Sequence, residues 1–245
     1  SGAAIGGFTD SYSERVDCIY NTGAMTVTIN GGEIEATANH NNAAIGDKGN
    51  GKSGVTINGG VIHAVGKGGA AGIGSKGDIR ITGGELTVSA EGSGAIGGSD
   101  YEHNVSSDGD TPGNLRQGGS ITINGGVVRT EPFALPEGNP LAVDSVGIGT
   151  CQMGYGGSVT INGGTVIAEA TCDAITTGYG GTITINGGDV TAIGGVNNFA
   201  EDLNRVIPGN GIGPYESGSV IINGGTVKAT AKGKGFGIGG ARIYN

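Results

Sequence analysis

The sequence predicts an all-β chain that folds as one three-sided parallel β-helix of about seven coils, with long loop insertions. Three observations carry this prediction. One glycine-containing phrase recurs along the whole chain, and such self-similarity is the signature of a repeat fold. Apolar and polar residues alternate with a period of two around that phrase, which indicates strands and not helices. The composition is dominated by small residues, with 56 Gly, four Phe and no Trp among 245 residues.

Three short phrases make up each predicted coil. The first is Ile-Asn-Gly-Gly or a near copy, preceded by a Thr-Ile strand such as 27–30. The second is the apolar run that follows, for example 165–168. The third is Gly-Ile-Gly or Ala-Ile-Gly, which recurs at Ile5, Ile45, Ile73, Ile96, Ile148, Ile212 and Ile238, and in altered form at Ile175. The shortest repeats have 23 or 24 residues, which suits one turn of a three-sided coil. The usual handedness of such crossovers is right-handed.

Stacked coils should place equivalent residues in ladders. We expect Val27, Ile29, Ile34 and Ala36 to point inward, as do the isoleucines of the Gly-Ile-Gly strand. The Gly-Gly pair should form the corner, because Gly adopts positive φ at little cost. The Asn before it should form an internal amide ladder, interrupted where Thr82 takes its place.

Charge and composition limit the possible partners. The net charge is −9 and the 13 Lys and Arg form no cluster, so neither nucleic acid nor an anionic membrane is an expected partner. No apolar run is long enough to span a bilayer. The cysteines Cys18, Cys151 and Cys172 have no metal-ligand spacing and suggest no disulfide framework. The chain begins inside a repeat, so we expect it to be one domain, residues 1–245, of a larger secreted protein.

The repeat grammar resembles a known group of proteins. Segments such as 157–166, Gly-Ser-Val-Thr-Ile-Asn-Gly-Gly-Thr-Val, are similar to the glycine-rich β-helix repeats of secreted or surface proteins from Firmicutes. They also resemble the clostridial pectate-binding family of β-helix carbohydrate-binding proteins. The resemblance implies an extracellular or cell-surface location and contact with a glycan. That family holds calcium with acids around an Asp-Gly-Ile phrase, and here only 172–175 keeps an acid at that place.

The insertions define where a ligand would be expected. Residues 7–25 and 98–119 follow the Gly-Ile-Gly strand, and residues 131–146 and 194–210 precede it. We therefore expect the Gly-Ile-Gly face to form the floor of a trough. Its outward Gly and Ala residues would let a ligand approach the backbone closely.

Aromatic and hydroxyl side chains are predicted along one edge of that trough. All seven tyrosines follow a Gly-Ile-Gly phrase or its altered form, and six of them precede the next Thr-Ile-Asn strand. Tyr offers a flat ring to a sugar face and a hydroxyl for a hydrogen bond. The candidate ligand-binding residues are Tyr101, Tyr155, Tyr179, Tyr215, Thr176, Thr177 and His103. The tyrosines could equally cover the corner and pack the insertions.

Carboxylates are the candidates for chemistry. Glycoside hydrolysis needs two carboxyl groups at a set separation. Asp173 breaks the repeat pattern, and Asp144 and Asp202 in the opposite wall could pair with it, although each could also be a solvated loop residue. Asp108 and Asp110 could hold calcium, which prefers oxygen ligands, or could belong to a plain turn. Calcium is the one candidate ion, and no other cofactor is expected.

Three functions follow from these features. The leading hypothesis is an extracellular carbohydrate-binding solenoid that takes a poly- or oligosaccharide along the Gly-Ile-Gly face. A glycoside hydrolase or polysaccharide lyase in the same trough is the alternative. A structural stalk or adhesin module is the third, although the insertions argue against a plain spacer. The outward Gly and Ala of the Gly-Ile-Gly face offer no threonine ladder of the kind that an ice-binding role would need.

Overall fold

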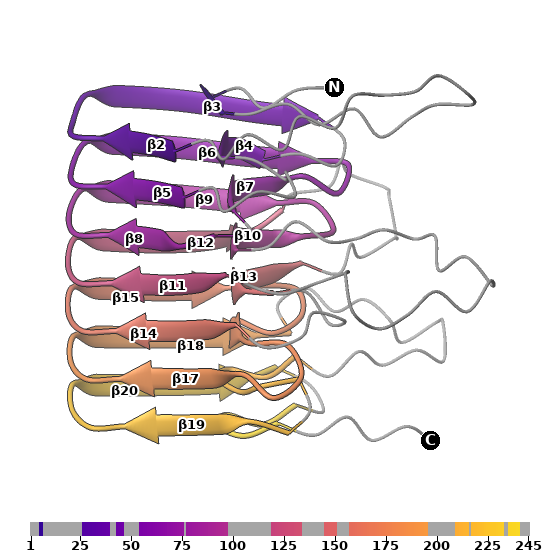
Figure 1. Cartoon of the computed structure of the whole chain (residues 1–245). Coiled ribbons are helices and arrows are strands. Elements are labelled where there is room, and N and C mark those ends of the chain that lie inside the picture. Colours follow the sequence, from indigo (N-terminus) through magenta and orange to yellow (C-terminus); the bar gives the residue numbers. More distant parts are fainter. Residues whose placement is uncertain are drawn as a thin grey trace.

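A computed structural model shows three parallel β-sheets stacked into a solenoid (Figure 1). It describes residues 5–6, 26–39, 43–46, 54–75, 77–97, 119–133, 145–150, 157–195, 209–215, 217–232 and 235–240. Each coil passes through sheets A, B and C in turn, and equivalent strands of successive coils are hydrogen-bonded neighbours. The predicted three-sided parallel β-helix is therefore confirmed.

The three sheets correspond to the three phrases of the sequence repeat. Sheet A holds the Gly-Ile-Gly strands, which are β1 (Ile5–Gly6), β4 (Ala43–Gly46), β7 (Ala71–Gly74), β10 (Gly94–Gly97), β13 (Val146–Gly149) and β16 (Ile175–Thr176). Sheet B holds the Thr-Ile-Asn strands, which are β2 (Thr26–Ile29), β5 (Gly54–Ile57), β8 (Ile79–Ile81), β11 (Ser120–Ile123), β14 (Ser158–Ile161), β17 (Thr182–Ile185) and β19 (Ser219–Ile222). Sheet C holds the longer strands, which are β3 (Glu33–Asn39), β6 (Val61–Lys67), β9 (Glu85–Ala90), β12 (Val127–Pro132), β15 (Thr165–Glu169), β18 (Asp189–Gly194) and β20 (Thr226–Ala231).

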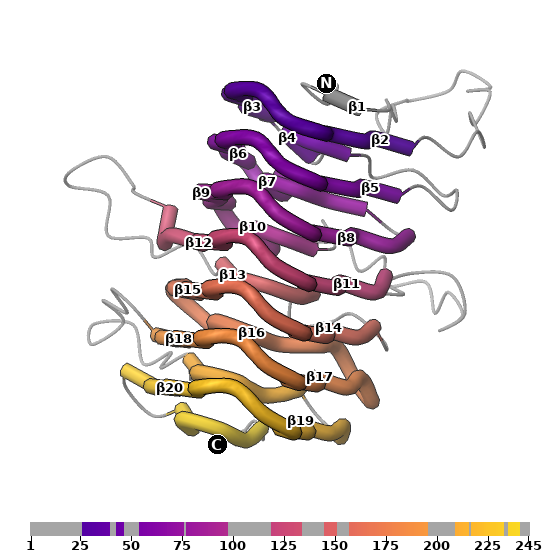
Figure 2. The backbone as a smooth tube through the Cα atoms, turned by 90° about the vertical axis from the view of Figure 1, so that its left-hand side faces the viewer, coloured from indigo at the N-terminus to yellow at the C-terminus, as the bar shows by residue number. Residues whose placement is uncertain are grey.

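Equivalent residues of successive sequence repeats are paired in the ladders. Ile29 pairs with Ile57 and Ile185 with Ile222 in sheet B, and Ile148 pairs with Ile175 in sheet A. Figure 2 shows how sheets B and C form two sides of each coil while sheet A closes the third. The inward residues form one continuous core of Ile, Val, Leu and Ala, so each coil is stabilised by its neighbours.

The Gly-Gly corner between sheets B and C requires glycine at its second position. Gly60 has a φ of 106°, and a Cβ there would lie 2.7 Å from the carbonyl oxygen of Gly32 in the preceding coil. A side chain would therefore cost both backbone strain and steric overlap. This explains why the second glycine of the phrase recurs at every corner.

The Asn ladder beside that corner is present, but on the outer surface. Nδ2 of four of these Asn residues donates to Oδ1 of the Asn one coil earlier, for example from Asn58 to Asn30 at 2.8 Å and from Asn223 to Asn186 at 2.7 Å. Both ends of these bonds are exposed or nearly so, and the prediction of an internal ladder was wrong on that point. In the coil without this Asn, Oγ1 of Thr82 donates to Oδ1 of Asn58 at 2.9 Å, so the row extends to Thr82. The amide bonds resume at Asn124, whose Oδ1 accepts from Nδ2 of Asn162 at 2.8 Å.

Sheet A differs from the prediction in a way that matters for function. Every described residue of β4, β7, β10 and β13 is buried, and because successive strand residues face opposite sides, both faces of this sheet are covered. A Cβ on Gly72 would lie 2.3 Å from Cγ1 of Val88, and one on Gly147 would lie 2.7 Å from Oγ1 of Thr130. These glycines therefore face sheet C, where they let the two sheets approach closely, and they do not form an exposed floor.

Candidate functional site

The predicted site residues fall into two groups. The structure describes Asp173, Thr176, Thr177, Tyr179 and Tyr215, and all five belong to two adjacent coils. The others lie outside the described residues: Tyr101, Tyr155, His103, Asp108, Asp110, Asp144 and Asp202. The site is therefore built from the first group and its neighbours.

The corner between sheets A and B brings the predicted hydroxyl and aromatic residues together. Thr176 ends β16, Thr177 and Tyr179 follow it, and Tyr215 occupies the same turn one coil later. The backbone N–H of Tyr215 donates to the carbonyl oxygen of Thr177 at 2.9 Å, which fixes the two turns to each other. The rings of Tyr179 and Tyr215 meet edge to face, with centroids 5.0 Å apart and planes at 75°. This geometry is favourable for an aromatic pair.

Exposure separates the members of this corner. Tyr215 is 4% exposed and Thr177 is 1% exposed, so neither presents a surface to a large ligand. Tyr179 is half-buried, so part of its side chain is at the surface. Its ring packs against the buried ring of Tyr215. Tyr179 is therefore the most exposed of the predicted residues that the structure describes.

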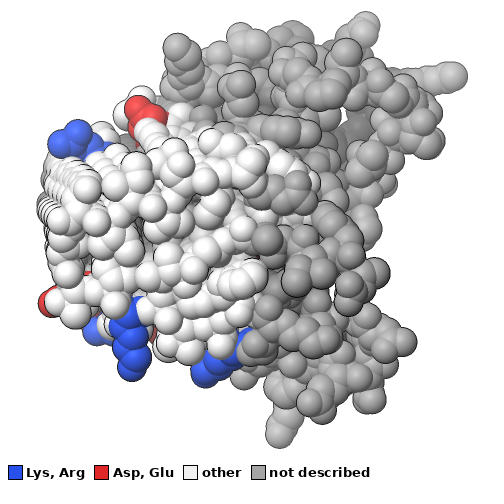
Figure 3. Space-filling model, turned by 90° about the horizontal axis from the view of Figure 1, so that it is seen from below, with Lys and Arg blue, Asp and Glu red and all other residues white. Residues whose placement is uncertain are grey.

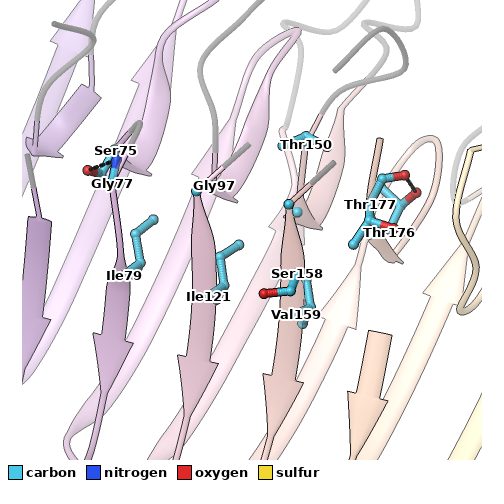
Figure 4. Close-up of a pocket in the computed structure, with 13 residues that line it drawn as sticks. Ser75, Gly77, Ile79, Gly97, Ile121, Thr150, Ser158, Val159, Thr176 and Thr177 are labelled. Atoms are coloured by element: carbon cyan, nitrogen blue, oxygen red, sulfur yellow. Dashed lines mark hydrogen bonds between the residues drawn. The ribbon is translucent and has the colours of Figure 1, made fainter. Parts of the chain in front are cut away.

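A small cavity lies at the same corner (Figure 4). It is lined by residues of three sheet-B strands, among them Ile121 and Val159, and by Gly149, Thr150 and Thr177 from the ends of sheet-A strands. Its volume of about 10 Å³ is on the scale of one water molecule and is far too small for a sugar ring. The cavity is thus part of the packing and not a ligand pocket.

Two buried hydroxyls at this cavity were not foreseen. Thr150 and Thr177 occupy equivalent positions in adjacent coils, because Ile148 pairs with Ile175. Within the described part of the chain neither Oγ1 has a hydrogen-bond partner, although both are buried. Aligning the isoleucine phrases would have shown that Thr recurs two residues after Ile in these two coils, but the sequence gives no sign of its burial.

The Asp173 side chain is hydrogen-bonded to the backbone of the next coil. Its side chain is 5% exposed, and Oδ1 accepts a hydrogen bond of 2.7 Å from the backbone N–H of Asn210 in the next coil. Asn210 repeats the arrangement, since its Oδ1 accepts from the N–H of Phe236 at 2.9 Å. In these coils sheet A is reduced to isolated bridges at Ile212 and Ile238. Asp173 and Asn210 therefore supply side-chain acceptors for backbone N–H groups beside sheet A, where its strands are shortest.

The predicted catalytic pairing cannot be measured in the structure, because Asp144 and Asp202 lie outside the described residues. A glycosidase needs two carboxyl groups about 5–10 Å apart. Asp173 is the one predicted catalytic carboxylate among the described residues, and one of its oxygens is already bound to a backbone N–H. In the same residues no group of three or more His, Cys, Asp or Glu side chains could hold a metal ion.

The outward face of sheet B, which adjoins the corner between sheets A and B, is partly exposed. Its outward positions are mostly Ser and Thr, and the register stacks them in two rows. Exposed or half-buried hydroxyls in these rows come from Thr26, Thr28, Thr56, Ser120, Thr122, Ser158, Thr160, Thr182, Thr184 and Ser219. Arg80 interrupts one row, and Asp78, which accepts a hydrogen bond from the Ser120 hydroxyl, borders the other. The face is therefore largely neutral and rich in hydroxyls. Its strand β17 begins at Thr182, three residues after Tyr179.

Comparisons with known proteins agree with the fold. Four segments match the model of a family described as Beta helix repeat, namely residues 27–50, 55–78, 183–214 and 220–242. Over these segments the sequence is similar to β-helix repeats, which agrees with the three parallel sheets of the structure. No curated protein and no solved structure matches the chain. Among the described residues there is also no helix that is long and apolar enough to cross a membrane.

Proposed function

We propose that this chain is an extracellular carbohydrate-binding β-solenoid, and that a neutral poly- or oligosaccharide lies along the tyrosine edge and over the adjoining face of sheet B. The observation that carries the proposal is the Tyr179–Tyr215 pair at the A/B corner. A half-buried ring held edge to face by a buried one is rigid, so little side-chain entropy is lost when a sugar packs against it.

The burial of sheet A changes where the ligand would lie. Both faces of β7, β10 and β13 are covered, so the Gly-Ile-Gly face itself is not accessible to a glycan. We therefore place the glycan on the neighbouring surface of sheet B. The hydroxyl rows of sheet B can donate to and accept from sugar hydroxyls. Their low charge suits a neutral ligand better than an anionic one.

The extracellular location rests on a different kind of support. The repeats resemble those of secreted and surface proteins, and the net charge of −9 with few basic residues suits neither nucleic acid nor an anionic membrane. A wettable, hydroxyl-rich solenoid is suited to exposure at a cell surface. The glycan partner is therefore sought among extracellular polysaccharides.

Replacement of Tyr179 with Ala tests this proposal. We expect the variant to bind a glycan identified on a broad array about threefold to tenfold more weakly than the wild-type chain, because one aromatic contact is lost. Isothermal titration calorimetry measures the change. Tyr179→Phe is the matched control, since it keeps the ring at the same place, and it should lose less affinity than Tyr179→Ala. If the folded wild-type chain binds no glycan on the array, the proposal is wrong.

A further inference from the structure

Two buried hydroxyl groups at the A/B corner have no hydrogen-bond partner in the described part of the chain. They are Oγ1 of Thr150 and Oγ1 of Thr177, whose side chains are 8% and 1% exposed. A buried polar group without a partner loses its bonds to solvent and gains none in return, so folded proteins keep few of them. Two such hydroxyls in adjacent coils therefore point to a partner that is not a protein side chain.

Both threonines line the same small cavity (Figure 4). Its volume of about 10 Å³ has room for one water molecule and for nothing much larger. Three buried hydroxyls lack a partner among the described residues, and Ser93 is the one of them that does not line this cavity. At Thr150 and Thr177, the unpaired hydroxyls and a water-sized space therefore occur together.

The ladder of sheet A sets the distance between the two threonines. Ile148 pairs with Ile175 and Gly149 with Thr176, and Thr150 and Thr177 are the next residues in this register. Neighbouring strands lie about 4.7–4.9 Å apart, whereas O–H···O bonds measure about 2.5–3.0 Å, so equivalent hydroxyls are too far apart for a direct bond. A water molecule about 2.8 Å from both oxygens would bond to them at an angle of roughly 115–120°, which is close to tetrahedral. The strand spacing thus suits one bridging water.

The lining of the cavity favours a neutral ligand. The lining residues that the structure describes are all Gly, Ile, Val, Ser or Thr, so none of them carries a charge. In the view from below, the Lys, Arg, Asp and Glu side chains that can be seen lie at the rim of the described residues (Figure 3). A cation here would be buried without a compensating charge, which is costly. Water can accept a hydrogen bond from one hydroxyl and donate to the other.

We propose that one ordered water molecule binds in this cavity and bridges the hydroxyls of Thr150 and Thr177. The two residues directly follow β13 and β16, which end at Gly149 and Thr176. The water therefore connects adjacent coils at the point where the backbone ladder of sheet A stops. It lies beside the hydrogen bond from the N–H of Tyr215 to the carbonyl oxygen of Thr177, which connects the next pair of coils.

Replacement of Thr177 with Val tests the proposal by the sign of its effect on stability. Val keeps the shape of Thr and lacks the hydroxyl, so a bridging water would lose one partner, and the melting temperature should fall by about 2–4 °C. If the hydroxyl is unpaired, its removal should instead raise the melting temperature. Because both threonines share one water, the double variant Thr150→Val/Thr177→Val should lose less than the sum of the two single losses. Thr160→Val, which removes a half-buried hydroxyl of sheet B, is the control and should change little.

A high-resolution crystal structure of the wild-type chain tests the water directly. We expect a density peak within hydrogen-bond distance of both hydroxyls, and its loss in Thr177→Val. A wild-type structure without this peak, a melting temperature that rises or stays the same in Thr177→Val, or strictly additive losses would each overturn the proposal. A peak that requires sodium or potassium in the crystals would identify a cation and would also overturn it. If a variant does not fold, the wild-type structure alone decides. None of these results depends on glycan binding.

Discussion

Replacing Gly149 with Ala is expected to lower the free energy of unfolding by about 2–6 kcal/mol, a large part of the 5–15 kcal/mol that is usual for a folded domain. Gly149 ends β13 with a φ of 126°, a region that L-residues rarely adopt. A Cβ there would lie 1.7 Å from the carbonyl oxygen of Thr176 in the next coil. Because backbone cannot move aside without breaking the ladder, strain and overlap add.

Thermal unfolding and native-state hydrogen exchange measure this loss. Two other glycines serve as controls. At Gly31 an added Cβ meets nothing within 4 Å and φ is not positive, so Gly31→Ala should be nearly neutral. Gly180 has a φ of 73° with nothing within 4 Å, so Gly180→Ala isolates the backbone cost, roughly 1–2 kcal/mol. Equal effects at Gly149 and Gly31 would contradict the close packing of sheet A.

Replacing Asp173 with Ala is expected to lower the free energy of unfolding by about 1–3 kcal/mol. The substitution removes the acceptor for the backbone N–H of Asn210, which lies in a buried part of the coil. Asp173→Asn keeps an oxygen at the same place and should lose less. Chemical denaturation of both variants measures the difference.

The same pair of variants separates a structural Asp173 from a catalytic one. If the carboxylate acts by holding the next coil, stability falls in the order wild type, Asn variant, Ala variant. A chain that cleaves a glycan, loses this activity in Asp173→Asn and keeps full stability in both variants would refute the structural role.

The fold could be predicted because every coil repeats the same short sequence phrases. The Ile-Asn-Gly-Gly phrase places the corner, and the spacing between phrases sets the register, so that Ile148 had to pair with Ile175. The proximity of Thr177 and Tyr215 follows from the same register, since both lie in the same turn of adjacent coils.

The direction in which sheet A faces could not be predicted in the same way. A period of two tells which residues share a face, but it does not tell which face meets the neighbouring sheet. In sheet B, and less strictly in sheet C, one face carries most of the polar residues, so the choice is clear. In strands such as 71–74, both faces carry small or apolar residues, and the close approach of Gly72 to Val88 is a tertiary contact. The burial of Thr177 and Tyr215 also depends on tertiary contacts, so it could not be predicted from the sequence alone.

The proposed binding surface can be tested directly by mapping amide chemical-shift changes in the ¹⁵N-labelled chain as a bound oligosaccharide is titrated in. The proposal predicts that the largest changes occur at Tyr179 and along the outward positions of sheet B, such as Thr182 and Thr184. Changes confined to the Gly-Ile-Gly strands 71–74, 94–97 and 146–149, with Tyr179 and sheet B unaffected, would contradict it.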